Sequence, residues 1–212
     1  MNNIINKIIE ENNNWSDPEY CLRAVKHNKF NLHSVRKQTL EICLAVVQQD
    51  SNMLKYIKIQ TPRICIVAVQ QIGLTLQYVK NQTPEICLAA VQQNGLALQY
   101  VKNQTLEICL ASVKQNGWAL EDVKIQTSEI CMTAVRQNGF ALQYVKNQTP
   151  EICFEAVQQN GNMLEYVKNQ TPEICTAAIK QNPEAYKYVR LPAVEPEREK
   201  FIRKLSFLLL SI

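Results

Sequence analysis

The sequence predicts an all-α fold: an α-solenoid of eight 22-residue two-helix repeats, with a capping helix at each end. Two observations lead to this prediction. The segment 83–104, TPEICLAAVQQNGLALQYVKNQ, returns almost unchanged at 149–170. Weaker copies fill residues 17–192 in the same phase, without insertion or deletion. A fixed period of about 20–50 residues is typical of solenoids and related arrays.

Each repeat opens with the signals of a helix start. In the repeat that begins at Thr83, which we take as position 1, the threonine hydroxyl can cap free backbone N–H groups. Pro84 suits the first helical turn, and Glu85 meets the positive end of the helix dipole. Ile86 and Val91 belong to an apolar pattern at helical spacing. We therefore expect a first helix of about ten residues.

A turn and a second helix complete the repeat. Asn94 and Gly95 end the first helix, and we expect the glycine to take the left-handed conformation that closes a helix. Leu98 and Val101 continue a shorter apolar pattern, and Lys102 faces the negative end of the dipole. This pattern predicts a second helix of about seven residues.

The two ends of the chain differ from the repeats. Residues 1–16 place isoleucines on one helical face, which predicts an N-terminal capping helix; a short partner-binding helix is the alternative. The apolar run in this segment is too brief for a signal peptide, so we expect none. Residues 193–212 predict a C-terminal capping helix, with a dimer or partner contact as the alternative. Its apolar end is far shorter than the roughly 18 residues of a membrane span, so we expect no membrane association.

Comparison of the repeats separates core positions from free ones. Positions 4, 8, 9, 16 and 19 keep apolar or small residues in nearly every repeat, and we assign them to the core. Position 16 is leucine seven times and then Tyr186. All eight cysteines occupy position 5. Equivalent helices in a stack lie about 8–10 Å apart, too far for disulfides, and neither a CxxC pair nor a histidine partner indicates zinc. We expect buried, reduced thiols.

Position 20 is basic in every repeat and has two interpretations. It could form a stripe that tracks phosphates, or a structural ladder of helix C-terminal cations that faces the glutamates at position 3. The net charge of +4 is mild and favours the structural interpretation. The candidate basic ladder consists of Lys58, Lys80, Lys102, Lys124, Lys146 and Lys168.

The variable positions 14 and 18 are the candidate partner-binding positions. Position 14 changes from leucine to tryptophan, phenylalanine, asparagine and glutamate, so the core does not dictate it. Position 18 is tyrosine in six repeats and Asp122 in another, which indicates partial exposure. Neighbouring Trp118 and Phe140 could form an exposed apolar patch, or they could pack between adjacent second helices. The candidate partner-binding residues are Leu74, Leu96, Trp118, Phe140, Tyr78, Tyr100 and Tyr144.

The sequence lacks the motifs of an enzyme. It contains no phosphate-cradling glycine loop, no metal-ligand cluster and no pair of nucleophile and base. Its only histidines, His27 and His33, lie in the divergent first repeat. We therefore predict no enzymatic activity, no cofactor, no metal and no small-molecule substrate.

The repeats resemble the short helical repeats of a domain-of-unknown-function family numbered 4116. The resemblance covers the eight repeats but neither terminal segment, and the core AVxQNGxALxYV, as in residues 134–145, carries it. It implies an origin in giant viruses of amoebae or in intracellular bacteria, and a cytoplasmic location, in the host cytoplasm if the protein is viral. The resemblance implies no activity and no site residues.

Extended repeat surfaces without catalytic motifs favour a non-enzymatic scaffold for protein–protein interaction, with a protein as the partner. The alternative function is binding of single-stranded RNA. This alternative is based on a trio of glutamine, tyrosine and asparagine at positions 17, 18 and 21. The trio resembles the side chains with which Pumilio-type repeats read one base per unit. The trio occurs as Gln77-Tyr78-Asn81, Gln99-Tyr100-Asn103 and Gln143-Tyr144-Asn147.

Overall fold

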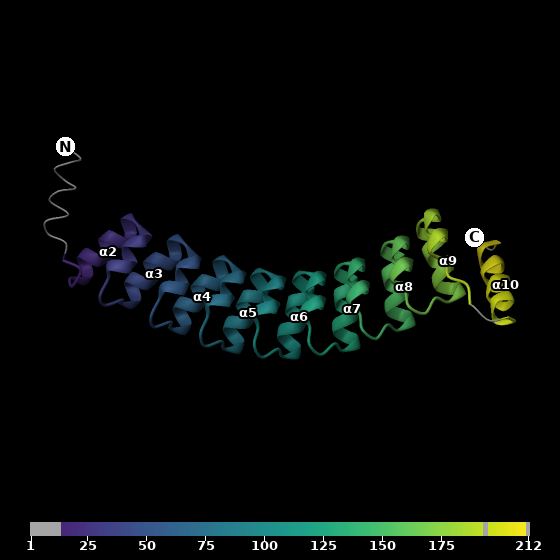
Figure 1. Ribbon diagram of the computed structural model, residues 1–212, viewed down its shortest axis with the longest axis horizontal. Coiled ribbons are helices and arrows are strands. Elements are labelled where there is room, and N and C mark those ends of the chain that lie inside the picture. Colours follow the sequence, from purple (N-terminus) through teal and green to yellow (C-terminus); the bar gives the residue numbers. More distant parts are fainter. Residues whose placement is uncertain (1–13, 193–194, 211–212) are drawn as a thin grey trace, which may run out of the picture. The chain divides into compact units, whose positions relative to one another are not determined.

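The computed structural model describes residues 14–192 and 195–210, and every regular element in this part of the chain is a helix (Figure 1). Each repeat contributes an α-helix and a short 3-10 helix, so the predicted all-α solenoid fold is confirmed. The α-helices are α2 (Pro18–His27), α3 (Leu40–Gln49), α4 (Pro62–Gln71), α5 (Pro84–Gln93), α6 (Leu106–Gln115), α7 (Ser128–Gln137), α8 (Pro150–Gln159), α9 (Pro172–Gln181) and the terminal α10 (Glu197–Leu210). The 3-10 helices are η1 (Lys29–Ser34), η2 (Ser51–Tyr56), η3 (Gly73–Tyr78), η4 (Gly95–Tyr100), η5 (Gly117–Asp122), η6 (Gly139–Tyr144), η7 (Gly161–Tyr166) and η8 (Pro183–Tyr188).

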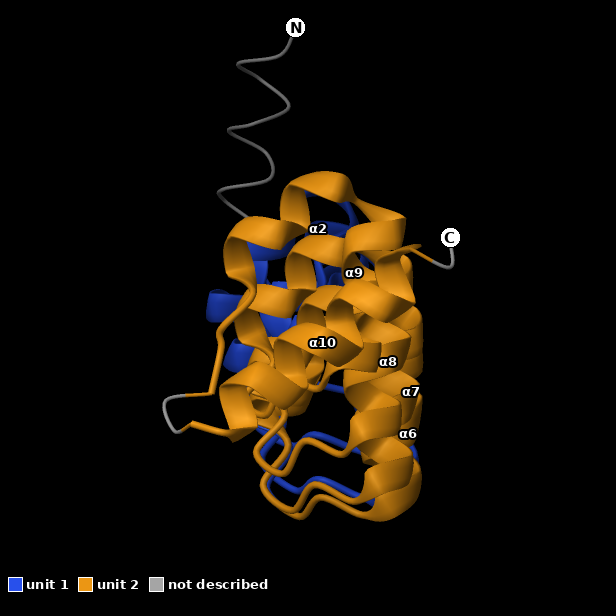
Figure 2. Cartoon of the chain, turned by 90° about the vertical axis from the view of Figure 1, so that its right-hand side faces the viewer, with its two compact units in different colours: residues 1–93, 100–102 blue, residues 94–99, 103–212 orange. Residues whose placement is uncertain are grey.

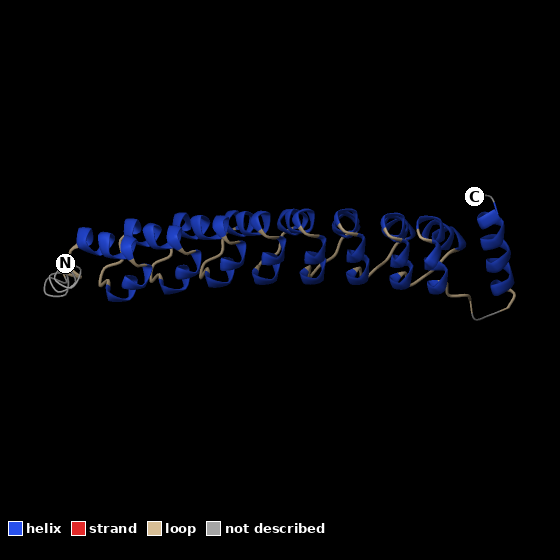
Figure 3. Ribbon diagram, turned by 90° about the horizontal axis from the view of Figure 1, so that it is seen from above, coloured by secondary structure: helices blue, strands red, loops and turns tan. Residues whose placement is uncertain are grey.

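The chain divides into two compact units, residues 1–93 with 100–102, and residues 94–99 with 103–212 (Figure 2). In the first unit each α-helix from α2 to α5 packs against the next, and η1, η2 and η3 pack in the same way. The second unit repeats this arrangement with α6 to α9 and with η5 to η8. Within each unit the α-helices thus form one row and the 3-10 helices another (Figure 3). The N-terminal capping helix predicted for residues 1–16 falls mostly on residues 1–13, which lie outside the described part of the chain.

The α-helices begin as the sequence predicts. The Thr61 hydroxyl accepts a hydrogen bond from the N–H of Ile64 at 3.4 Å, and Pro62 occupies the first turn. This bond satisfies one of the backbone donors that a helix start leaves without an internal partner. The other threonines that cap helices in the same way are Thr39, Thr83, Thr105, Thr127, Thr149 and Thr171.

The second element of each repeat is a six-residue 3-10 helix and not the expected helix of about seven residues. Its apolar residues recur every three positions, as in Gly95, Leu98 and Val101, and three residues make one turn of a 3-10 helix. An asparagine at position 12 caps this element in most repeats; Asp50 does so in the second repeat, and Ile72 in the third provides no side-chain cap. In the fifth repeat Asn116 Oδ1 accepts the N–H of Trp118 at 3.0 Å.

The structure corrects the reason for the glycine at position 13. No described glycine has a positive φ, so the expected left-handed conformation is wrong. The next repeat instead lies against the glycine. A Cβ on Gly117 would lie 2.6 Å from the carbonyl oxygen of Ala134 and 2.9 Å from Gln137 Oε1. Glycine is therefore needed for the close approach of two repeats and not for a special backbone conformation.

The core columns are buried inside each unit, but the last repeat departs from them. Tyr186, which the sequence places in the core at position 16, is 65% exposed. The reason is that α10 packs on α9, with Phe201 buried, and makes no recorded contact with η8. Lys204 of α10 forms an ion pair with Glu173 of α9. In the described part of the chain, no helix has the length and apolar character to span a membrane.

Candidate functional site

A column of glutamines at position 22 joins each repeat to the next. Gln126 Nε2 donates to the carbonyl oxygen of Tyr144 at 2.9 Å, and Gln126 Oε1 accepts the backbone N–H of Lys146 at 3.0 Å. The amide thus pairs with the loop backbone of the following repeat as a second peptide group would. We call this pair of bonds the glutamine clamp. The residues that form it are Gln38, Gln60, Gln82, Gln104, Gln126, Gln148 and Gln170.

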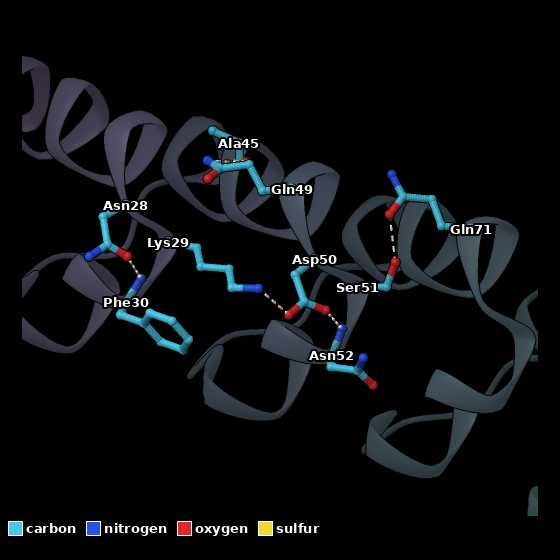
Figure 4. A network of polar contacts seen from close by, with 9 residues as sticks. All are labelled: Asn28, Lys29, Phe30, Ala45, Gln49, Asp50, Ser51, Asn52 and Gln71. Atoms are coloured by element: carbon cyan, nitrogen blue, oxygen red, sulfur yellow. Dashed lines mark hydrogen bonds and ion pairs between the residues drawn. The ribbon is translucent and has the colours of Figure 1, made fainter.

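A second glutamine column, at position 11, bonds in the opposite direction along the chain. Gln137 Oε1 accepts the N–H of Gly117 in the preceding repeat at 2.6 Å. The same bond joins Gln93 to Gly73, Gln115 to Gly95 and Gln181 to Gly161. In the second repeat, where Ser51 replaces the glycine, its hydroxyl donates to Gln71 Oε1 instead (Figure 4). Among the described residues, no buried side-chain nitrogen or oxygen lacks a hydrogen-bond partner.

The basic ladder at position 20 also lies against the preceding repeat. The Lys80 ammonium donates to the carbonyl oxygen of Lys58 at 3.1 Å, and the Lys168 ammonium donates to that of Lys146 at 2.8 Å. Lys102 and Lys146 make the corresponding bonds to the carbonyl oxygens of Lys80 and Lys124. The sequence pointed to the glutamates at position 3 as partners. The structure instead gives these four ammonium groups a row of carbonyl oxygens as partners, which supports a structural role for the ladder.

The cysteines at position 5 are all free and buried. Burial raises the pKa of Cys43, Cys153 and Cys175 to about 11, because the thiolate loses its hydration. Five of the eight thiols face the clamp: Cys131 Sγ, for example, lies 3.6 Å from Gln126 Oε1. Within the described ranges 14–192 and 195–210, no group of three His, Cys, Asp or Glu residues is arranged to hold a metal ion. The thiols therefore act as small core residues next to the clamp.

The structure brings together three of the candidate partner-binding residues. The rings of Trp118 on η5 and Phe140 on η6 are stacked, with centroids 6.2 Å apart and planes 14° apart. The Tyr144 ring meets the Trp118 ring edge-on, with centroids 5.7 Å apart. Trp118 is 38% exposed and Phe140 is 41% exposed, and Tyr144 is half-buried. We call these three residues the aromatic cluster. It lies entirely within the second unit.

The other candidates are less exposed and more dispersed. Leu74 and Tyr78 on η3 are half-buried in the first unit, and Leu96 and Tyr100 on η4 are also half-buried. The structure records no ring contact for Tyr100. Tyr78 lies within 5.9 Å of the ammonium of Lys55. The glutamines of the amide–tyrosine trio bond to their own 3-10 helix: Gln143 Nε2 donates to the carbonyl oxygen of Phe140 at 3.1 Å.

Sequence reasoning missed two features of this surface. The first is the glutamine clamp, although position 22 is glutamine in every repeat that precedes another repeat and Pro192 in the one that does not. That contrast was the available signal. The second is the pair of carboxylates that borders the aromatic cluster. In the sequence Asp122 appears only as a break in the tyrosine series at position 18, and the relation of Glu121 and Asp122 to Tyr144 depends on the register of neighbouring 3-10 helices.

A family model matches the repeats directly. Residues 84–126, 105–149, 127–171 and 149–191 each match the family described as "Domain of unknown function (DUF4116)". Every matched segment spans two successive repeats, and together the segments cover more than half of the chain. No curated protein and no solved structure gives a match. The chain therefore belongs to the family of domains of unknown function called DUF4116.

Proposed function

We propose that this chain is a non-enzymatic scaffold that binds a partner protein through the row of 3-10 helices in its second unit. The observation that carries this proposal is the exposure of the aromatic cluster. Trp118 and Phe140 belong to position 14, which takes no part in either glutamine column. Exposed, contiguous aromatic rings on a rigid support are typical of the anchor residues of protein interfaces.

The contrast between the core and position 14 supports the proposal. The residue at position 14 offers its backbone N–H to the asparagine cap, as Phe140 does to Asn138 at 3.0 Å, and its side chain is free to vary. Leucine, tryptophan, phenylalanine, asparagine and glutamate all occur there. A position at which the core does not dictate the side chain can change that side chain to suit a partner. Solenoids use such positions on an extended surface as binding sites.

Two observations favour a protein over RNA as the partner. Lys80, Lys146 and Lys168 direct their ammonium groups to backbone carbonyl oxygens, so part of the donor capacity of each ammonium is already in use. Glu121 and Asp122 place negative charge beside the aromatic cluster, where it would repel phosphates. The buried free thiols fit a reducing compartment, and we propose the cytoplasm, or the host cytoplasm if the protein is viral, as its location.

Affinity capture with a matched control tests this proposal. The tagged full chain, the double variant Trp118→Ala with Phe140→Ala, and the control Asn162→Ala at the same repeat position are incubated with native cell extract, with and without nuclease. We expect the same proteins to be retained by the wild type and by Asn162→Ala, and to be lost from the double variant. Nuclease should change nothing. Retention by the double variant, or loss on nuclease treatment, would contradict the proposal.

A further inference from the structure

Two acidic residues border the aromatic cluster. Glu121 and Asp122 follow Trp118 on η5, at positions 17 and 18. Desolvation and then the charge of Glu121 raise the pKa of Asp122. Desolvation, the charge of Glu121, a hydrogen bond to Glu121 and the charge of Asp122 raise the pKa of the Tyr144 phenol. Glu121 follows Trp118 by three residues, which is one turn of the 3-10 helix η5, so their side chains lie on the same face of η5, and Asp122 is the next residue. Asp122 is half-buried, and partial burial makes its carboxylate costly to keep charged in the absence of a cation.

The same row of 3-10 helices already holds cations against its aromatic rings elsewhere. In the first unit the Lys55 ammonium, at position 17, lies 4.8 Å from the ring centroid of Tyr56 and 5.9 Å from that of Tyr78. In the second unit Lys187, also at position 17, lies 5.1 Å from the ring centroid of Tyr188. An ammonium within about 6 Å of a ring centroid is attracted by the ring's negative face.

The first and second repeats together combine a ring with a carboxylate. The Lys29 ammonium lies 5.3 Å from the ring centroid of Phe30 and 2.6 Å from Asp50 Oδ2 (Figure 4). One cation is thus shared between an aromatic face and an acid. The fifth and sixth repeats together offer two acids and three rings, but position 17 of the fifth repeat is Glu121 in place of a lysine. This site therefore has the rings and the carboxylates that would hold a cation. At position 17, where two other repeats have a lysine, it has a carboxylate instead.

We propose that Trp118, Phe140, Tyr144, Glu121 and Asp122 together bind an arginine side chain from a basic segment of the partner protein. This inference rests on the proposed scaffold function and names the chemistry of its partner. Arginine suits the site because its planar guanidinium stacks on aromatic rings and can donate to two carboxylates at once. It is also more weakly hydrated than the lysine ammonium, so it gives up less on entering a half-buried site.

Fluorescence titration of the full chain with defined peptides tests this proposal. Trp118 and Trp15 are the only tryptophans, so the variant Trp15→Phe makes Trp118 the reporter. The probes are acetyl-Gly-Ser-Arg-Ser-Gly-amide and the same peptide with citrulline, which keeps the shape of arginine without its charge. We expect the arginine peptide to bind about tenfold more tightly. Combining Glu121→Gln with Asp122→Asn should remove that preference, and the control Glu165→Gln, at position 17 of the seventh repeat beside Asn162, should leave it unchanged.

The outcomes separate this inference from the scaffold function. Equal affinity for the two peptides, an arginine preference that survives in the double variant, or failure of both peptides to change Trp118 fluorescence would overturn the arginine site. In each case the scaffold function would still be decided separately, by whether the capture of protein depends on Trp118 and Phe140. Tighter binding of a single-stranded oligouridine than of the arginine peptide would overturn it too. Far-ultraviolet circular dichroism of each variant shows that the repeats remain folded.

Discussion

Gln126 and Gln143 have the same side chain, yet they lie in two regions with different roles. Gln126 lies between repeats, where its amide bonds to two backbone groups of the next repeat. Gln143 lies on the exposed edge of η6, where its amide bonds only to the carbonyl oxygen of Phe140 in its own 3-10 helix. The region between repeats must therefore keep its side chains, because they bond to backbone groups of the next repeat, one of them part-buried, that have no partner within a helix. The exposed edge is free to change, and the aromatic cluster lies on that edge.

The largest expected effect comes from breaking the clamp. Gln126→Leu keeps the size of the side chain but leaves the N–H of Lys146 and the carbonyl oxygen of Tyr144 without partners. The unsatisfied, part-buried carbonyl oxygen of Tyr144 costs about 1–3 kcal/mol, and the lost bond to the exposed N–H of Lys146 adds about 0.5–1.5 kcal/mol, so we expect the free energy of unfolding to fall by about 3 kcal/mol. Gln143→Leu on the exposed edge should change it by less than about 0.5 kcal/mol. Urea denaturation of the two variants measures the difference, and equal losses would contradict the assigned roles.

The glycines at position 13 offer a second test, of how closely neighbouring repeats approach each other. A Cβ on Gly117 would lie 2.6 Å from the backbone oxygen of Ala134, whereas one on Gly139 would lie 3.3 Å from that of Ala156. We expect Gly117→Ala to reduce the free energy of unfolding by about 2 kcal/mol, since backbone atoms must move. Gly139→Ala should cost less than about 1 kcal/mol, because a shift of a few tenths of an ångström relieves the contact. Thermal unfolding of both variants checks the order, and a larger loss for Gly139→Ala would be inconsistent with it.

A smaller effect is expected for the ion pair between Lys29 and Asp50, which stand at positions where most repeats have glycine and asparagine. The hydrogen bond from Lys29 is the main cause that lowers the pKa of Asp50. A lowered folded-state pKa stabilises the fold above the unfolded-state pKa, and this stabilisation is lost as the pH falls through the folded-state pKa. Lys29→Met should therefore reduce the free energy of unfolding by about 1 kcal/mol at pH 7 and leave it nearly unchanged at pH 2. Urea titrations at the two pH values test this, and the same loss at both would show that the ion pair is not responsible.

The smallest effect is expected at the exposed edge itself. The raised pKa of Asp122 means that its ionised form is disfavoured in the folded chain, so folding becomes less stable as the pH rises through that pKa. Asp122→Asn should therefore raise the free energy of unfolding at pH 7 by a few tenths of a kcal/mol, and this gain should vanish near pH 3, where the aspartate is protonated. A loss of stability at pH 7 would indicate that the carboxylate is held by a favourable partner.

The sequence predicted the features that recur from repeat to repeat. The period predicted the α-solenoid fold, and the threonine, proline and glutamate that begin most repeats placed the first helix. The columns that stay apolar identified the core, except in the two terminal repeats, where several members are only half-buried and Tyr186 is exposed, because the helix that follows the last repeat packs on α9 and not on η8. These predictions were correct because each feature depends only on one repeat and its neighbours, which are nearly identical along the chain.

The sequence did not predict what depends on contact between particular repeats. The glycines are explained by the next repeat's backbone, which no single repeat reveals. Four lysines of the basic ladder bond to carbonyl oxygens of the preceding repeat, where the sequence predicted the glutamate column, because these lysines extend toward the preceding repeat. Trp118 and Phe140 were predicted as neighbours, but the edge contact with Tyr144 and the nearby carboxylates follow from the register of η5 against η6.

The most direct test of the glutamine clamp is hydrogen exchange at the backbone amide of Lys146. This amide lies outside any helix, after the end of η6, and its recorded acceptor is Gln126 Oε1 at 3.0 Å. We predict slow exchange of the Lys146 amide in the wild type, comparable to that of amides inside α7, and a rise of at least about tenfold in Gln126→Leu, with no change in Gln143→Leu. Fast exchange in the wild type, or an unchanged rate in Gln126→Leu, would contradict the claim that glutamines hold the repeats together.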